Sequence, residues 1–319
     1  MSVRTSPLGL WVLLAWFLIS YFALNYLNVI RPFPIGWDDL GSYLNRPRQI
    51  VSYGHFIYSM ATFQWEYLTS LGFLLFGFDS TFGATASLVI NWTQGILATM
   101  AVYLFGYVFI GRSERPSAGL LAATLYYILP MVGHFSFADM KIDNSLFATG
   151  ALAVFCTFRV LFPAQEQEER SLKHELLWIA LAGVLAGFAF GMKVTAIMII
   201  MALGAVLLGA ALHPLAFVGA MFCAVAVFGY MGALDVTTVT DRLGYATGAN
   251  AQWIFIGINM VIGVLCLAGA ALLGRTRLRR TALLTGVLLA GFFVSIYPWI
   301  QNNSIRHGHL LPTIELGSP

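Results

Sequence analysis

Long runs of uncharged, mostly apolar residues recur along the chain and are separated by short polar segments. The first run covers 23 residues from Leu8 to Ile30, a length that lets one helix cross a bilayer. The runs do not show the alternation of a membrane β-strand, so they predict helices. The fold class is therefore all-α, a polytopic transmembrane helical bundle. Nine spans are expected, at 8–30, 83–110, 116–134, 143–162, 176–191, 194–212, 215–233, 253–274 and 281–300.

Prolines and polar interruptions set the limits of these spans. The uncharged run from Val194 to Leu234 is too long for one crossing, and His213-Pro214 divides it because proline ends one helix and can start the next. The segment 40–80 is aromatic-rich and broken by Glu66 and Asp79, which fits interfacial or re-entrant helices better than a span. We expect one domain over 1–319, with a first outer loop at 31–82 that carries the interfacial helices, and an outer C-terminal tail at 301–319.

Composition agrees with a membrane protein. Hydrophobic residues make up 59% of the 319, mean hydropathy is +0.80, and 10% of residues are charged. The first run is too long for the apolar region of a secretory signal and lacks a small-residue cleavage site, so we expect a retained signal anchor. The three cysteines all fall in expected spans and offer neither a disulfide framework nor a metal-binding pair.

Charged residues are unevenly distributed between the two sides of this topology. With a cytoplasmic N-terminus, ten of the seventeen basic residues fall on the cytoplasmic side. All seven aspartates, at 38, 39, 79, 139, 143, 235 and 241, fall on the other side, which is therefore the expected working face. Aspartate also favours turns and helix N-caps, and we interpret Asp79, Asp235 and Asp241 in that way.

Two adjacent carboxylates, Asp38 and Asp39, stand in the first polar segment after the first span. Carboxylates this close raise each other's pKa unless a cation intervenes, and one of them could act as a general base toward an acceptor hydroxyl. The structural alternative is that they cap an interfacial helix beginning near Leu40, with Trp37 as an interfacial anchor. The local sequence leaves both interpretations open.

The outer loop from His134 to Asn144 concentrates two acids, a lysine and a histidine. Asp143 starts the next span, so it could cap that helix as well as take part in catalysis. Asp139 and Asp143 are four residues apart and would share a face if this stretch were helical. Oxygens from Asp139 and from Asp38 or Asp39 suit a hard divalent cation such as Mg²⁺ or Mn²⁺, although carboxylate pairs without a defined spacing are common.

Several basic residues could contact an anionic substrate. Lys193 is a lone charge between apolar runs of 17 and 41 residues, and a lysine in that setting needs an acid partner or a watery cavity. We interpret it as a partner for a phosphate or a carboxylate. Lys141 in the outer loop, Arg306 in the tail and His55 in the first outer loop are further substrate-binding candidates.

The order of these features resembles the GT-C superfamily of membrane glycosyltransferases, which includes protein O-mannosyltransferases and the bacterial aminoarabinose transferases of lipid A. The resemblance rests on Trp37-Asp38-Asp39, the aromatic segment ending in Leu74 to Phe78, the turn Gly111-Arg112, Asp139 and Asp143 leading into Leu146-Phe147, the stretch Gly183 to Thr195, and Pro298-Trp299 to Asn302-Asn303. Lys141-Ile142 stands where many relatives carry Arg-Pro, which leaves the donor-phosphate contacts open. The chain ends soon after its ninth expected span, and we expect a truncated or unusually compact member.

The resemblance implies a membrane enzyme that transfers a sugar from a polyprenyl phosphate to a lipid, glycan or protein acceptor, with inversion, at the outer face of a bacterial inner membrane. It makes Asp38 or Asp39 the base, with a slight preference for Asp38. Asp143 and Asp139 would support catalysis or hold a cation, and Lys193 would hold the donor phosphate. No nucleic-acid partner is expected.

Two other classes of protein remain as alternatives. A secondary transporter also hides charges among many spans, but places them near the membrane midplane in broken helices, whereas here the acids cluster at span ends on one side. A non-catalytic assembly or lipid-binding protein would make the acidic pair incidental.

Overall fold

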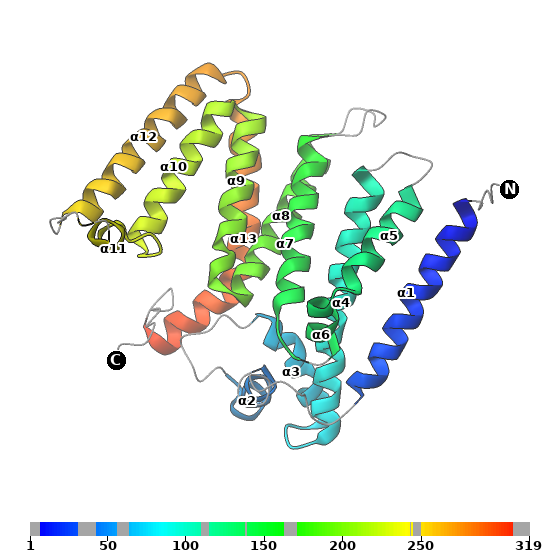
Figure 1. The fold of residues 1–319 in the computed structure, drawn as a ribbon. Helices are drawn as coiled ribbons and strands as arrows, with labels where there is room; N and C mark the ends of the chain where they lie inside the picture. Colours follow the sequence, from blue (N-terminus) through cyan, green and yellow to red (C-terminus); the bar gives the residue numbers. More distant parts are fainter. Residues whose placement is uncertain are drawn as a thin grey trace. The chain divides into compact units, whose positions relative to one another are not determined.

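The computed structural model describes residues 7–30, 43–55, 64–109, 115–137, 139–162, 171–242, 244 and 250–308, and these residues form helices, turns and loops without a strand. The chain divides into two compact units. Unit 1 takes in Met1–Phe155, Leu185–Ala196 and Val294–Pro319, and unit 2 takes in Cys156–Val184 and Ile197–Phe293. Figure 1 traces the order of the helices along the chain.

Unit 1 contains the N-terminal half of the chain. Its complete elements are α1 (Pro7–Val29), α2 (Asn45–Tyr53), α3 (Gln64–Phe76), α4 (Thr81–Phe109), α5 (Arg115–Tyr127), α6 (Pro130–Phe137) and the short 3-10 turn η2 (Val194–Ala196). It also holds most of α7 (Asp143–Leu161) and the C-terminal ends of α8 (Leu172–Met192) and α13 (Leu278–His307). Helix α4 packs against α3, α5 and α6, so it is the central element of this unit.

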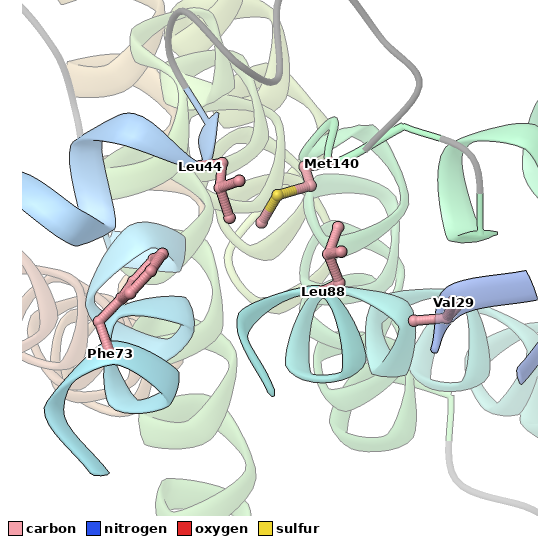
Figure 2. Close-up of a cluster of buried hydrophobic side chains, with 5 residues drawn as sticks. All are labelled: Val29, Leu44, Phe73, Leu88 and Met140. Atoms are coloured by element: carbon pink, nitrogen blue, oxygen red, sulfur yellow. The ribbon is translucent and has the colours of Figure 1, made fainter. Parts of the chain in front are cut away.

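A small hydrophobic cluster joins α4 to its neighbours at one end. Val29 from α1, Leu44 from the turn before α2, Phe73 from α3, Leu88 from α4 and Met140 from the segment before α7 are all buried in it. Figure 2 shows the Met140 side chain directed toward Leu44 and Leu88. The cluster therefore anchors the segment before α7, which carries candidate site residues on either side of Met140.

Unit 2 contains α9 (Ile197–Ala211), α10 (Pro214–Tyr230), α11 (Val236–Arg242), α12 (Ala251–Leu273) and the remaining parts of α7, α8 and α13. Helix α10 lies between α9 and α12 and packs on both (Figure 1). Close packing of α10 on α12 depends on small residues: a methyl group on Gly263 would lie 3.0 Å from the carbonyl oxygen of Gly219 and 3.0 Å from the backbone nitrogen of Cys223. Such small residues let helix backbones approach where burial from water gives no driving force.

Several expected local features of unit 2 are present. The uncharged run divides at the predicted position, because α9 ends at Ala211 and α10 begins at Pro214. The Nδ1 atom of His213 caps α10 by accepting a hydrogen bond from the Leu215 amide at 3.2 Å. Asp235 caps α11 by accepting from the Thr237 amide at 2.9 Å.

The polytopic helical fold is confirmed, with differences in individual spans. In the described residues, seven helices are long and apolar enough to cross a membrane. The span expected at 215–233 is α10, which is apolar but has 17 residues. The span expected at 116–134 is wrong as a single helix: α5 ends at Tyr127 and α6 begins at Pro130, because a proline cannot donate the backbone hydrogen bond that would continue α5.

The α10 and α12 contact gives a testable prediction. We expect Gly263→Ala to destabilise the protein by about 1–3 kcal/mol, because the new methyl group meets backbone atoms that cannot move aside. Thermal unfolding of the detergent-solubilised chain measures the effect. Gly257→Ala is the control, since it lies on the same helix with nothing within 4 Å of the added methyl group; equal midpoints for the two variants would contradict the packing argument.

Candidate functional site

Charged and buried side chains alternate along the segment that enters α7. Met140 and Ile142 are buried, while Asp139, Lys141 and Asp143 are partly exposed. Alternation of this kind places successive side chains on opposite sides of an extended backbone. The two apolar residues therefore hold the segment against the unit, and the three charged side chains stay partly exposed. Residues 139–142 are not helical, so the condition under which Asp139 and Asp143 would share a helical face is not met.

Two carboxamides from the buried side of α4 hold this segment in place. Gln94 donates through Nε2 to the carbonyl oxygen of Lys141 at 2.6 Å and accepts through Oε1 from the amide of Ser145 at 3.0 Å. Asn91, one turn earlier, donates to the carbonyl oxygen of Asp139 at 3.4 Å and accepts from the Trp65 indole at 2.9 Å. The backbone on both sides of Asp143 is thus fixed by a side chain with no exposed surface.

Lys193 meets Asp143 at the start of α7. The lysine lies in the break between α8 and η2, and its Nζ is 3.8 Å from the Asp143 Oδ1. Both side chains are about half exposed, at 51% and 43%, and an exposed ion pair contributes only about 0–1 kcal/mol to stability. Asp143 also stands in the first turn of α7, where the helix dipole favours a negative charge. The pair therefore presents one cation and one carboxylate that remain accessible to a ligand.

A second carboxylate of unit 1 is almost fully buried. Glu66, in the first turn of α3, is 2% exposed and its Oε1 lies 3.3 Å from the Arg46 Nη1. Burial raises the pKa of Glu66 from 4.5 to about 7, and the Arg46 charge opposes that rise only in part. Helix α3 is not one of the candidate spanning helices. Glu66 therefore changes its protonation state close to neutral pH.

The remaining predicted residues are placed unequally. Asp38 and Asp39 lie outside the described residues, and so does the side chain of Arg306, although its backbone belongs to α13. Lys141 lies with its Nζ 5.6 Å from the centre of the Phe135 ring. The contacts described for His55 are both with Tyr53, through the carbonyl oxygen at 2.8 Å and through the rings. Within the described part of the chain there is no group of three or more His, Cys, Asp or Glu side chains arranged to hold a metal, so the cation expected between Asp38 and Asp139 stays a prediction.

The family model described as dolichyl-phosphate-mannose-protein mannosyltransferase matches residues 62–232, more than half of the 319. The chain belongs to this family. The match takes in α3, α4, the segment before α7 and Lys193. No curated protein and no solved structure matches the chain. The expected membership of the GT-C glycosyltransferases is confirmed, and the protein is an integral, multi-pass membrane glycosyltransferase that uses a lipid-linked sugar donor.

Sequence reasoning missed three buried polar residues of this glycosyltransferase, two of which hold the segment before α7. Asn91 and Gln94 are polar residues within the apolar run at 83–110, and polar groups inside a span are costly unless they bind to something. Two polar residues inside an apolar run therefore indicated buried hydrogen bonds. The position of these residues did not indicate that their partner is the segment before α7. Glu66 stood out as an interruption of segment 40–80, whereas its burial depends on the packing of α3 on α4.

The hydrogen bonds of Gln94 predict a coupled loss of stability and activity. We expect Gln94→Leu to destabilise the protein by about 1–3 kcal/mol, because the Lys141 carbonyl and the Ser145 amide lose their partner. Sugar transfer should fall as well, since the backbone around Asp143 is released. Thermal unfolding and transfer rate are measured together, with Thr93→Val as the control because the Thr93 hydroxyl, among the described residues, donates to the Ile90 carbonyl of its own helix. Indistinguishable behaviour of the two variants would show that Gln94 does not position the segment.

Glu66 predicts how stability depends on pH. A carboxyl whose folded pKa is raised stabilises the protein fully below its unfolded pKa, and this contribution is lost as the pH rises through the folded pKa. Stability of the wild type should therefore fall from pH 4.5 to about 7, by on the order of 3 kcal/mol for a buried group. Glu66→Gln should remove this fall in stability. Asp79→Asn, at a carboxylate that is 70% exposed, should keep the wild-type dependence of stability on pH. A wild-type midpoint that rises across the interval would contradict the prediction.

Proposed function

We propose that the protein transfers mannose from a polyprenyl phosphate to an acceptor hydroxyl at the outer face of the bacterial inner membrane, with its N-terminus in the cytoplasm. The family description supports mannose and the lipid phosphate. The aspartates at the ends of the expected spans support the outer face, because they gather on the side opposite most of the basic residues.

The observation that carries the proposal is the accessible pair of Lys193 and Asp143. A polyprenyl phosphate that carries a sugar has a negatively charged phosphodiester, and the Lys193 ammonium can pair with it. As the acceptor oxygen bonds to the anomeric carbon, the bond from that carbon to the phosphate oxygen breaks, and polyprenyl phosphate leaves with an additional negative charge. A fixed cation at this position stabilises the departing phosphate more strongly than it stabilises the bound donor.

The acceptor loses its proton to a carboxylate, and we assign this role to Asp38 or Asp39. Attack by the acceptor on the face opposite the leaving phosphate inverts the anomeric centre in one step. Asp143 would hold Lys193 in place before the donor binds, and Asp139, Lys141, Arg306 and His55 remain candidate contacts for the donor or the acceptor. The proposal assigns charge stabilisation to Lys193, and activity after EDTA treatment tests whether Mg²⁺ or Mn²⁺ contributes through Asp38 and Asp139.

The full chain, reconstituted in vesicles with radiolabelled polyprenyl-phosphate mannose and peptide, glycan or lipid acceptors, tests this function. Replacing the true base, through Asp38→Asn or Asp39→Asn, should lower turnover by about 10²–10⁴-fold, the usual contribution of general base catalysis. Lys193→Ala should reduce transfer strongly and leave the thermal midpoint nearly unchanged, because the ion pair is exposed. The control is Lys173→Ala, at an exposed lysine in the first turn of α8.

The anomeric configuration of the product, determined by NMR, tests inversion. If the wild-type chain transfers no sugar from any polyprenyl-phosphate donor, yet moves a solute across the vesicle membrane, the enzyme assignment is wrong and the transporter alternative is favoured.

A further inference from the structure

Buried polar atoms without a partner gather at two places in unit 1. At the start of α3 they are Gln64 Oε1 and Glu66 Oε2, and near the end of α13 they are Asn302 Nδ2 and both amide atoms of Asn303, none of which has a partner among the described residues. Asn303 is 1% exposed. A buried polar group left unpaired is costly, and native proteins retain few of them. Such a group at the edge of a candidate site therefore calls for a ligand.

The first of these places contacts α13, the helix that carries the second. The Gln64 amide donates to the carbonyl oxygen of Ser295 on α13, and the Gln64 side chain packs so closely on Gly191 of α8 that a methyl group there would overlap it. Trp299 packs edge-on against Phe190, with ring centres 5.6 Å apart. Since Ser295, Trp299 and Asn303 are spaced four residues apart, they share one face of α13. Asn303 thus continues the helix face that meets the start of α3 and the end of α8.

The same contacts relate this face to Lys193. Gly191 lies against Gln64, and Lys193 follows it by two residues, or at most about 7 Å of chain. A donor whose phosphate pairs with Lys193 would therefore carry its sugar close to Gln64, which contacts this face of α13 at Ser295.

The chemistry of the unpaired atoms indicates the kind of group that fits. A carboxamide with both ends unpaired offers an uncharged donor and an uncharged acceptor. Sugar hydroxyls, which both donate and accept, match this pair without bringing a charge into a buried site. We propose that Asn303, about two helical turns along α13 from the Ser295 carbonyl that Gln64 contacts, forms a subsite for the hydroxyl groups of a sugar. Asn303 lies outside the residues matched by the family model, and the inference rests on the proposed glycosyltransfer.

Asn303→Leu and Asn303→Ala in the full, detergent-solubilised chain test the subsite. Both variants should bind polyprenyl-phosphate mannose about tenfold more weakly, the loss expected for one or two hydrogen bonds, while binding of polyprenyl phosphate without a sugar stays unchanged. The thermal midpoint without substrate should stay constant or rise, because an unpaired buried amide is removed. Thr285→Val is the matched control: its hydroxyl is also buried without a partner among the described residues and lies on the part of α13 that belongs to unit 2, so it should leave binding unchanged.

The arms of the experiment separate the sources of the hydroxyl group. Weaker donor binding and a raised KM for the donor support the donor sugar, and a raised KM for the acceptor alone supports an acceptor hydroxyl. Unchanged binding and KM values in both Asn303 variants overturn the subsite, and so does a lowered midpoint in both, because the amide would then be satisfied by the chain itself. A wild type that neither binds nor transfers the sugar overturns the proposed function instead, and the subsite with it.

Discussion

Gln94 has no exposed surface and uses both ends of its carboxamide on the backbone of the segment that enters α7. A carboxamide within an apolar helix has few alternatives to such bonds, because water is excluded and the helix backbone is already paired. The segment is constrained in turn, because the Lys141 carbonyl and the Ser145 amide also need hydrogen-bond partners where water is excluded. This mutual requirement fixes the direction of Asp143, and with it the position at which Lys193 can meet a carboxylate.

The Lys193 and Asp143 pair contributes less to the fold than the buried polar contacts of unit 1 do. Glu66 is buried against Arg46, and Asn91 and Gln94 are buried against backbone, so each is tied to folding. Lys193 and Asp143 are half exposed and 3.8 Å apart, which is an ion pair without a close hydrogen bond. An anionic ligand can therefore replace Asp143 as the partner of Lys193 at small cost. The buried amides of Asn91 and Gln94 hold the backbone of the site in place, while the exposed Lys193 and Asp143 pair can exchange partners. A site that keeps its shape and still exchanges ligands needs both properties.

The sequence allowed most of the helices to be predicted, because the length of an uncharged run is a local property. The break at Lys193 and the start of α10 at Pro214 were also local, since a lone charge and a proline act on their own helix. The division of α5 from α6 was missed because Pro130 sits within an otherwise uncharged run. Gln94 bonds to Lys141 and Ser145, which follow it by 47 and 51 positions in the sequence. These bonds depend on how α4 packs, and no local sequence pattern contains that information. The same holds for Asn303, because the lack of partners for its two amide atoms among the described residues depends on how α13 packs on its neighbours in unit 1.

The alternation along residues 139–143 separates two tasks within one short segment. Met140 and Ile142 are buried, while the α4 amides donate to the backbone carbonyl oxygens of Asp139 and Lys141. Substitutions at 139 and 141 therefore leave these hydrogen bonds to α4 in place, because they are accepted by carbonyl oxygens that every residue carries.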